Sequence, residues 1–374
     1  MVWECCCAAG RGAWLSQREN HYLKVIAVLV EEIRQLGKMN KQFAAIILAA
    51  GKGTRMGASG LHKVCLEVQG VPVILRALET YKACGSALNI IVVGAMSQSV
   101  MATVNRRFPE TTYAFQEKPL GTGDAARKGA DMLQQTGFEG DVLVVAGDKV
   151  IDPKVIRQLL STHAESGADV TLATAKRPAG SSAGILLKSS CGGIAGILEE
   201  SERRRIVAIA ALSELFYERD AIGPDAVIEA IRNSGGEKVA LDLAAEIWGK
   251  DARELTRREH EKLFSADERL GFIQAGDQRF SAARVCEQCD QMNMATYLFR
   301  APVLHESLSR LKSNRANQEE YLTDVFESLA RGASPARIIG CEISAPEDLM
   351  AFNTPEELRA IEDVYRRRLK KGGG

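Results

Sequence analysis

Short apolar runs alternate along this chain with longer stretches in which apolar residues recur every three or four positions. The runs predict strands at 44–50, 88–95, 111–117, 141–148 and 168–177. The stretches between them predict helices at 71–85, 97–108, 123–135 and 153–166. Alternation of strand and helix at this spacing predicts an α/β fold, with a Rossmann-like, mostly parallel sheet flanked by helices.

The pattern changes after residue 178. The segment 181–201 predicts a hairpin with Gly192 and Gly193 at its turn, and 202–285 predicts a charged helical insertion. Strands at 292–300 and 336–343 and helices at 302–312 and 318–331 follow. Thr354 as N-cap and Pro355 in the first turn predict the start of a C-terminal helix, with 366–374 as a frayed tail.

The N-terminal segment 1–38 stands apart from this alternation. Residues 21–36 have helical spacing, and Met39 reads as a natural chain start just before the first strand. We interpret 1–38 as an N-terminal extension, either non-native or a docking helix, and 39–365 as the functional domain.

Composition narrows the classes of function. Hydrophobic residues make up 46% of the 374 residues, enough for a full core, and 48 basic side chains balance 48 acidic ones. This balance predicts neither a nucleic-acid nor a membrane partner, and no apolar run reaches the ~20 residues of a membrane span. Nine cysteines in a long chain favour the cytoplasm over a disulfide framework. Cys286 and Cys289 form one CxxC pair, read as ordinary thiols or half of a zinc site.

The first predicted strand runs directly into the glycine-rich, basic segment AAGKGTRM, with a further lysine at position 63. Glycines let backbone N–H groups approach phosphate oxygens, and Arg55 and Lys63 can neutralise phosphate charge. The spacing does not fit a Walker A loop, and it differs by one residue from the GxGxxG turn of dinucleotide-binding proteins. A basic surface turn is the alternative without function.

Seven segments, in order over about 44–365, resemble the motifs of sugar-1-phosphate nucleotidyltransferases. They are LAAGKGTRM with HKV, FQEKPLGTGDA, VLVVAGDKV, GILEES, MNMATYLF, EEYLTDVF and LMAFNTPEEL. Their order and the YLTD segment resemble most closely the uridylyltransferase domain of bacterial UDP-N-acetylglucosamine pyrophosphorylases. The resemblance implies the nucleotide-diphospho-sugar transferase type of fold, without the acetyltransferase β-helix that often follows in that family.

The resemblance also implies a reaction. A sugar 1-phosphate, with N-acetylglucosamine 1-phosphate as the expected acceptor, attacks the α-phosphorus of UTP, giving a nucleotide sugar and pyrophosphate. Positioning of two anions and neutralisation of charge would supply the catalysis. The implied partners are a nucleoside triphosphate and a sugar 1-phosphate, and the implied cofactor is Mg²⁺. The sequence does not indicate an oligomeric state.

Site residues follow from the matched motifs, one by one. Arg55 and Lys63 are the expected catalytic cations, and Asp148 and Asn353 the expected metal ligands. Gly184, Glu199 and Asn293 are expected to contact the sugar. The nucleotide is expected to contact Leu48, Ala49, Ala50, Gly51, Gly53, Thr54, Gln116, Gly121 and Thr122.

Five of these assignments have a structural alternative. Asp148 is also placed to cap the helix predicted after 152, and FNTP at Asn353 is an ordinary helix entry. Glu199 and Asn293 also suit a solvated surface, and Gln116 suits a polar strand end.

The chain departs from the family pattern at several places. His62 replaces the usual Pro before the lysine, Asp124 stands where His or Asn is common, and Lys149-Val150 replaces x-Pro. Ala183-Gly184-Ile185 replaces a Tyr-Gly-Arg turn, so the acceptor pocket is less well indicated than nucleotidyl transfer. These changes keep open a non-catalytic nucleotide-sugar-binding or regulatory protein, and a nicotinamide oxidoreductase is a third hypothesis.

Overall fold

In the computed structural model, residues 42–51, 61–313, 319–331 and 335–372 are described. Residues 43–374 form one compact unit. The predictions made for 1–38, and for Gly53, Thr54 and Arg55, lie outside the described residues.

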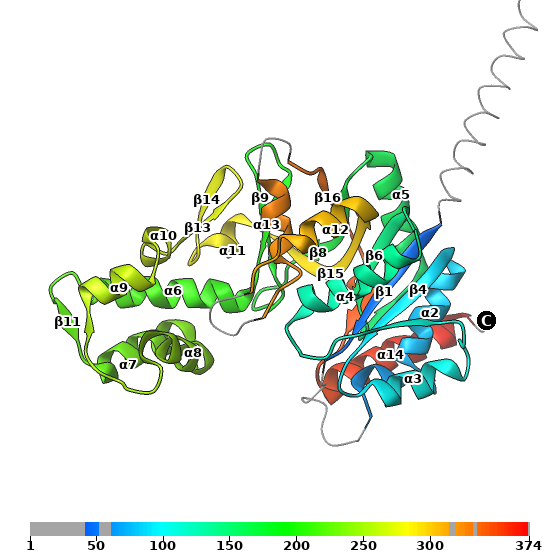
Figure 1. Ribbon diagram of the computed structural model, residues 1–374, viewed down its shortest axis with the longest axis horizontal. Helices are drawn as coiled ribbons and strands as arrows, with labels where there is room; N and C mark the ends of the chain where they lie inside the picture. The colour runs from blue at the N-terminus through cyan, green and yellow to red at the C-terminus, as the bar shows by residue number, and fades with distance from the viewer. Residues whose placement is uncertain (1–41, 52–60, 314–318, 332–334, 373–374) are drawn as a thin grey trace, which may run out of the picture. The chain divides into compact units, whose positions relative to one another are not determined.

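Half of the central sheet is parallel, as the alternating pattern predicts. The strands β6, β1, β4 and β5 lie side by side in that order, all parallel; the first three are labelled in Figure 1. They span β1 (Phe43–Ala49), β4 (Ser86–Val93), β5 (Thr112–Phe115) and β6 (Asp141–Ala146), and the crossovers hold α2 (Val73–Ala83), α3 (Ser97–Asn105) and α4 (Thr122–Gln135). Their carboxyl ends therefore meet at one edge of the sheet.

Strand β1 is buried on both faces, which explains its continuous apolar sequence. Alternate residues point to opposite faces: Ala45 and Ile47 belong to one core cluster, and Ala44 and Ile46 to another. The first cluster includes α2, α3 and α5 side chains, and the second includes α4 and α12 side chains. This two-sided burial holds the end of β1 rigidly between its neighbours.

The other half of the sheet is mixed. Strand β15 is antiparallel to both β6 and β8, β9 and β10 form an antiparallel hairpin, and β16 is parallel to β8. The bounds are β8 (Val170–Lys176), β9 (Ile185–Lys188), β10 (Ile194–Leu198), β15 (Gln291–Arg300) and β16 (Ile338–Glu342), with α5 (Pro153–Ser166), α12 (Ala301–Ser309) and α13 (Asp324–Ala330). The predicted hairpin is confirmed, with Gly192 at its turn at a φ of 83°.

Helices dominate the segment between β10 and β15, around a separate core of Ile209, Leu212, Val227, Ile231 and Leu243 among others. They are α6 (Glu200–Glu214), α7 (Pro224–Gly235), α8 (Glu237–Trp248), α9 (Arg257–Leu263), α10 (Ala266–Arg269) and α11 (Val285–Gln288), with the short pair β11 (Ala221–Ile222) and β12 (Leu255–Thr256). The prediction of a largely helical segment missed the hairpin β13 (Phe272–Ala275) and β14 (Gln278–Ser281). Its turn is Gly276-Asp277, with Gly276 at a positive φ, a two-residue connection that suits hairpins.

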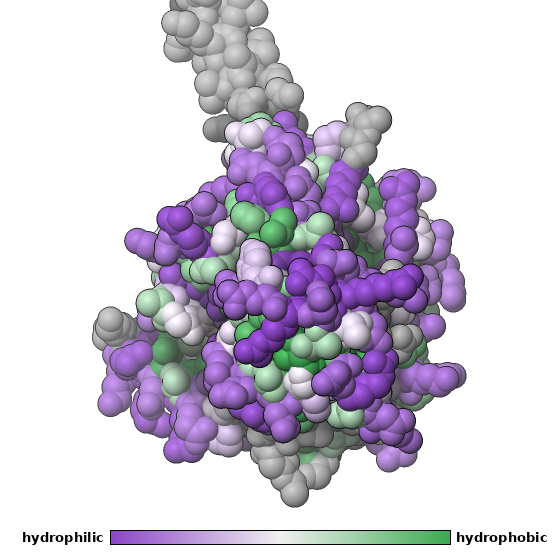
Figure 2. Space-filling model, turned by 90° about the vertical axis from the view of Figure 1, so that its left-hand side faces the viewer, coloured by the Kyte–Doolittle hydropathy of each residue, from purple (hydrophilic) through white to green (hydrophobic). Residues whose placement is uncertain are grey.

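Figure 2 shows that the face on the side of the helical segment is mostly hydrophilic, with small separate hydrophobic spots. Large apolar side chains exposed in the described part of this segment include Tyr217, Leu241 and Leu270. Isolated apolar residues of this kind are normal on a solvated surface.

The C-terminal helix is anchored by a small apolar cluster of Val68, Val73, Val150, Phe352 and Ile361. The elements involved are η2 (Lys63–Cys65), β2 (Glu67–Val68), β3 (Val71–Pro72), β7 (Lys149–Ile151), η3 (Pro346–Asp348), β17 (Leu349–Ala351) and α14 (Pro355–Gly372). The Thr354 hydroxyl accepts from the Glu357 backbone N–H, so the predicted N-cap is confirmed. The helix continues to Gly372, beyond the start of the expected tail, because Arg368 pairs with Asp152 and Asp348.

Candidate active site

Four segments that follow parallel strands converge at one edge of the sheet. Gly51 follows β1, Gly94 follows β4, Gln116 follows β5 and Asp148 follows β6. Ligands of open α/β sheets bind outside this edge. The predicted nucleotide-binding and metal-binding segments therefore lie at the position where the fold favours a ligand.

The end of β1 packs closely against its neighbours. A Cβ on Gly94 would lie 2.6 Å from the Ala50 carbonyl oxygen, and the Gly147 N–H donates to the Leu48 carbonyl at 2.8 Å. Ala49 and Ala50 are buried and Gly51 is exposed. Leu48, Ala49, Ala50 and Gly51 are thus held at the predicted site.

His62 is tied to the glycine-rich segment. Its Nε2 lies 2.5 Å from the Gly51 carbonyl oxygen, and its Nδ1 accepts from the Val64 N–H at 3.3 Å. This pair of contacts requires the neutral ring with its proton on Nε2. Burial lowers the pKa of His62, which favours that form. The departure from proline at this position thus supplies a cross-link between Gly51 and the lysine segment.

Lys63, Asp148 and Asn353 converge. The Lys63 ammonium forms an ion pair with Asp148 Oδ2 and donates to Asn353 Oδ1 at 3.3 Å. Three of the four residues on which the predicted site depends therefore share one location, and Arg55 lies outside the described residues.

The strand pair β7–β17 explains how such distant residues meet. Lys149 is opposite Ala351 in this antiparallel ladder, so Asp148 and Asn353 flank adjoining strand ends. Phe352 is fully buried beside Asn353 and fixes that end of the ladder. The position of Asn353 therefore depends on a short sheet and a core residue.

The structural alternative for Asp148 is excluded by α5. The side chain that caps this helix is Asp152, which accepts from the Lys154 N–H at 3.0 Å. Asp148 is 9% exposed, and its Oδ1 is buried with no hydrogen-bond partner among the described residues. A buried carboxylate oxygen without a partner is costly, so this atom fits a ligand such as a cation.

This donor set fits Mg²⁺ in its usual protein setting. Mg²⁺ is held by one or two carboxylate or amide oxygens, completed by waters and substrate phosphates. The described residues contain no cluster of three or more His, Cys, Asp or Glu side chains suited to a metal. Asp148 and Asn353 would hold the ion with a phosphate as partner.

Lys149, a departure from the family pattern, lies between these groups. Burial lowers its pKa, the charge of Asp148 opposes that shift, and the charge of Lys63 adds to it. Lys63 and Lys149 therefore both act electrostatically on Asp148 at this edge of the sheet.

Gln116 is buried and its amide is fixed. Its Nε2 donates to the Gly121 carbonyl at 3.1 Å and to Asp124 Oδ2 at 2.8 Å. The sequence left Asp124 unexplained, and the structure shows its role: it holds the Gln116 amide. Gln116 is therefore a positioned polar group and not merely a strand end.

The segment 319–323 is hydrogen-bonded to the turn at Gly121. The Gly123 N–H donates to the Glu320 carbonyl at 2.7 Å, and the Glu320 N–H donates to the Leu120 carbonyl at 2.7 Å. The Thr122 hydroxyl accepts from the Leu322 N–H at 3.0 Å. The predicted helix 318–331 therefore begins only at Asp324, because the backbone before it pairs with this turn.

The three predicted sugar residues also lie together. The Asn293 N–H donates to the Gly184 carbonyl at 2.8 Å, and a Cβ on Gly184 would lie 3.3 Å from Glu199 Oε1. Burial raises the pKa of Glu199, and a hydrogen bond from Thr323 opposes that rise. Asn293 Nδ2 donates to the Tyr297 hydroxyl at 2.7 Å, which orients its amide.

Sequence reasoning missed the residues that support these groups. Arg127 pairs with Glu320 and lies 3.9 Å from Asp124, and Thr323 and Tyr297 hold Glu199 and Asn293. Asp324, the acid of the YLTD segment, has a pKa raised to about 6 by burial and by Glu327, Glu202 and Glu199. The spacing of Asp124 and Arg127 on one helix was the available signal.

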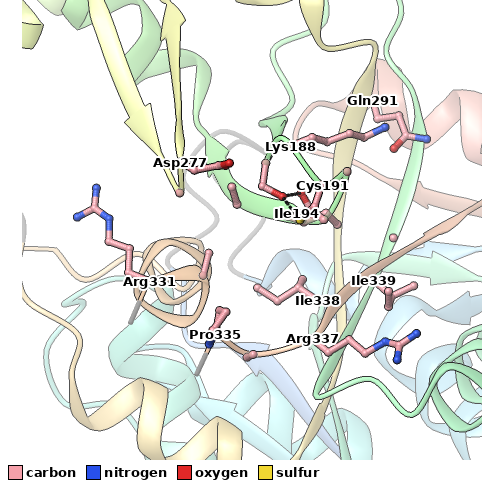
Figure 3. Close-up of a pocket in the computed structure, with 18 residues that line it drawn as sticks. Lys188, Cys191, Ile194, Asp277, Gln291, Arg331, Pro335, Arg337, Ile338 and Ile339 are labelled. Carbon is pink, nitrogen blue, oxygen red and sulfur yellow. Dashed lines mark hydrogen bonds between the residues drawn. The ribbon is translucent and has the colours of Figure 1, made fainter. Parts of the chain in front are cut away.

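A separate cavity of about 970 Å³ lies beside the β9–β10 and β13–β14 turns and β16. None of the predicted site residues lines it. Figure 3 shows Lys188, Arg331 and Arg337 at its rim pointing in different directions. Diverging charges do not form a binding constellation.

Two further predictions concern cysteines and membranes. Cys286 and Cys289 both carry free thiols. Among the described residues, every helix is too short or too polar to cross a membrane.

The sequence of part of this chain is similar to a known protein family. Residues 45–215 match the MobA-like NTP transferase domain. The bifunctional protein GlmU of Lactobacillus johnsonii is 36% identical over 165 residues, 44% of this chain and 34% of that protein. The bifunctional protein GlmU of Clavibacter sepedonicus is 31% identical over 220 residues, 58% of this chain and 42% of that protein. The chain thus matches less than half the length of these relatives.

Solved structures confirm the fold class. A UDP-glucose pyrophosphorylase complexed with UDP-glucose has a TM-score of 0.52 at 14% identity, covering 87% of this chain and 99% of that one. A putative glucose-1-phosphate thymidylyltransferase from Bacillus anthracis in complex with a sucrose also gives 0.52 at 14% identity, covering 87% and 95%. At this identity the likeness concerns the fold alone. Residues 45–215, a little under half of the chain, are thus similar to the MobA-like NTP transferase domain, and the fold is that of sugar nucleotidyltransferases.

Proposed function

We propose that this chain transfers a nucleotidyl group, uridylyl from UTP, to a sugar 1-phosphate and releases pyrophosphate. The observation that carries the proposal is the convergence of Lys63, Asp148 and Asn353 beside the end of β1. N-acetylglucosamine 1-phosphate is the first acceptor to test, because the motifs quoted above resemble those of bacterial UDP-N-acetylglucosamine pyrophosphorylases.

In this reaction an oxygen of the sugar 1-phosphate attacks the α-phosphorus in line, and pyrophosphate leaves. The P–O bond to the β-phosphate breaks as the new P–O bond forms, so the protein needs no nucleophile. Lys63 stabilises the charge on the reacting phosphates, and the glycine-rich segment with Arg55 would contact the triphosphate. Alignment of two anions contributes up to ~7–11 kcal/mol to the lowering of the barrier.

Mg²⁺ fits the oxygens of Asp148 and Asn353 and would neutralise phosphate charge when bound. Lys63 holds both oxygens in one place before any ligand enters. Gln116 faces the base, and Gly184, Glu199 and Asn293 face the hydroxyl groups of the sugar.

A pyrophosphate-release screen tests the proposal. It crosses four nucleoside triphosphates with a panel of hexose and hexosamine 1-phosphates, with and without Mg²⁺. We expect release with UTP and at least one sugar 1-phosphate, dependent on Mg²⁺. Binding of UTP or a UDP-sugar with no turnover across the panel would instead favour a non-catalytic sensor.

A further inference from the structure

Three side chains that the proposed reaction does not use form a line of contacts behind Gln116. Asp124 accepts from Gln116, Arg127 lies 3.9 Å from Asp124, and Arg127 also pairs with Glu320. Asp124 stands where the family pattern has His or Asn, and Glu320 immediately precedes the YLTD segment. One arginine therefore joins a departure from the family pattern to one of its motifs.

The contacts allow only one orientation of the Gln116 amide. Both partners of its Nε2, the Gly121 carbonyl and the Asp124 carboxylate, are acceptors only. Rotating the amide would place Oε1 against two acceptor oxygens, an arrangement without a hydrogen bond. The NH₂ group is thus fully used, and Oε1 receives no hydrogen bond from any residue in the described ranges.

The pair is also well anchored. Gln116 and Asp124 are each 5% exposed, and in such surroundings an unmet hydrogen bond is costly. The Glu320 backbone is itself held by two hydrogen bonds to the turn 120–123, so Arg127 is tied to a fixed point.

We infer that Asp124, held by Arg127 and Glu320, is a positioning residue that makes Gln116 present only its carbonyl oxygen to the base. The base must then offer an N–H at that point. Uracil does so at N3, whereas N3 of cytosine carries a lone pair, and the N–H groups of cytosine lie one position along the edge, on its 4-amino nitrogen. Asp124 therefore selects UTP over CTP. This inference rests on the proposed function and assigns a base preference to the same site.

A neutral isostere separates this role from simple packing. In Asp124→Asn, the new side chain offers either an oxygen or an NH₂ group, so it can pair with either orientation of Gln116. The Gly121 carbonyl still favours the original orientation, so selection is weakened and not abolished. A purely structural role would weaken UTP and CTP binding by the same factor.

The experiment is equilibrium titration of UTP and of CTP, with Mg²⁺, into the full chain and its variants. We expect the unmodified protein to bind UTP on the order of a hundredfold more tightly than CTP. Asp124→Asn should reduce that ratio by about tenfold, the worth of one good hydrogen bond to a charged group. Asp131→Asn, an exposed acid on the same helix, should leave the ratio unchanged.

Two additional variants keep the inference testable if Asp124→Asn fails to fold. Arg127→Gln should shift the ratio in the same direction, and thermal melting reports whether each variant is folded. In a Gln116→Ala background, Asp124→Asn should have no further effect on the ratio. An unchanged ratio in folded Asp124→Asn, or an equal loss for both nucleotides, overturns the inference.

The outcomes also separate the inference from the proposed function. Pyrophosphate release with an unaltered UTP to CTP ratio in Asp124→Asn leaves the function standing and refutes the role of Asp124. Unmodified protein that binds neither nucleotide refutes both.

Discussion

At the scale of single residues, Asp148 is the residue on which the proposed metal site depends most. One of its oxygens pairs with Lys63, and the other is buried without a partner in the described ranges. A carboxylate in that situation fits a cation that enters with the substrate. The assignment from the Gly-Asp motif is thereby strengthened, because the competing role as a helix cap belongs to Asp152.

Replacing Asp148 by Asn should lower kcat by about 100-fold or more, since a neutral amide holds Mg²⁺ and orients Lys63 poorly. Steady-state kinetics of pyrophosphate release measures the effect. The melting temperature should stay within a few degrees, and Asp131→Asn should retain full turnover. Normal turnover in folded Asp148→Asn would remove the metal role.

How much of the site was predictable differs from residue to residue. Lys63, Asp148 and Asn353 were predictable because each stands in a recognisable motif. Arg127 was only half predictable: its spacing from Asp124 on one helix was visible, but nothing in the sequence shows that Glu320 lies on its other side. Such supporting contacts depend on tertiary pairing and not on local pattern.

At the scale of elements, the turn at Gly121 is the most constrained connection in the site. Gly121 has a φ of 99°, and a Cβ there would lie 2.4 Å from the Glu320 carbonyl oxygen. Backbone strain and a backbone clash act together at this position.

Gly121→Ala should raise the KM for the nucleoside triphosphate about tenfold or more, because the clash with Glu320 displaces the carbonyl that fixes the Gln116 amide. The matched control is Gly137→Ala, which has a φ of 70° but no atom within 4 Å of its added Cβ. Initial-rate kinetics compares the two. An equal change in KM for both variants would mean that backbone strain alone, and not the contact between Gly121 and Glu320, determines the KM.

At the same scale, the helices around His260 make the folding stability of the protein depend on pH. Burial, together with the nearby Arg269, lowers the pKa of His260 to about 4, and the ring packs between Phe216 and Phe264. The unfolded chain takes up a proton near pH 6.5, but the folded chain only near pH 4. Stability is therefore fully present above pH 6.5 and falls as pH falls towards 4.

His260→Leu should reduce this fall in the free energy of unfolding by on the order of 3 kcal/mol. Urea unfolding at pH 7 and pH 4 measures the difference. His305→Leu, on α12 and outside this cluster, should keep the pH dependence of the unmodified protein. A variant at 260 with an unaltered slope would contradict the assignment.

The longer strands and helices of 43–176 were predictable because apolar period and length agree there, whereas the two- and three-residue elements β2, β3, η2 and β7 were missed. The hairpin β13–β14 was not predictable, because its four-residue strands carry little periodicity within a charged, helix-rich segment. The antiparallel pairing of β15 could not be predicted from the hydrophobic pattern either, because β15 follows the helical segment and not a strand–helix–strand crossover.

At the scale of the whole molecule, Glu200 joins the helical segment to the sheet. It lies at the start of α6 and pairs with Arg203 at 2.7 Å, Arg204 at 2.9 Å and Arg177, which follows β8, at 3.4 Å. Hydrogen bonds from Arg203 and then Arg204 lower the pKa of Glu200 to about 2. The helical segment and the sheet thus share one charged junction.

Glu200→Gln should cost about 3 kcal/mol of stability at pH 7, because Arg177 is 9% exposed and loses its counter-charge. Urea unfolding at constant ionic strength measures it. Glu306→Gln removes an exposed pair with Arg310 and should cost at most about 0.5 kcal/mol. Equal losses in the two variants would argue against a buried junction.

The late position of Asn353 in the chain has a consequence for damaged protein. Cleavage anywhere between β16 and β17 would spare Lys63, Asp148 and Gln116 yet sever the covalent tether of Asn353 and Phe352. In a protein nicked there, Asn353 would still be held by the β7–β17 ladder and by the apolar cluster around Phe352. One proposed metal ligand would then depend on non-covalent contacts, so the affinity of nicked protein for Mg²⁺ would follow the stability of the C-terminal helix.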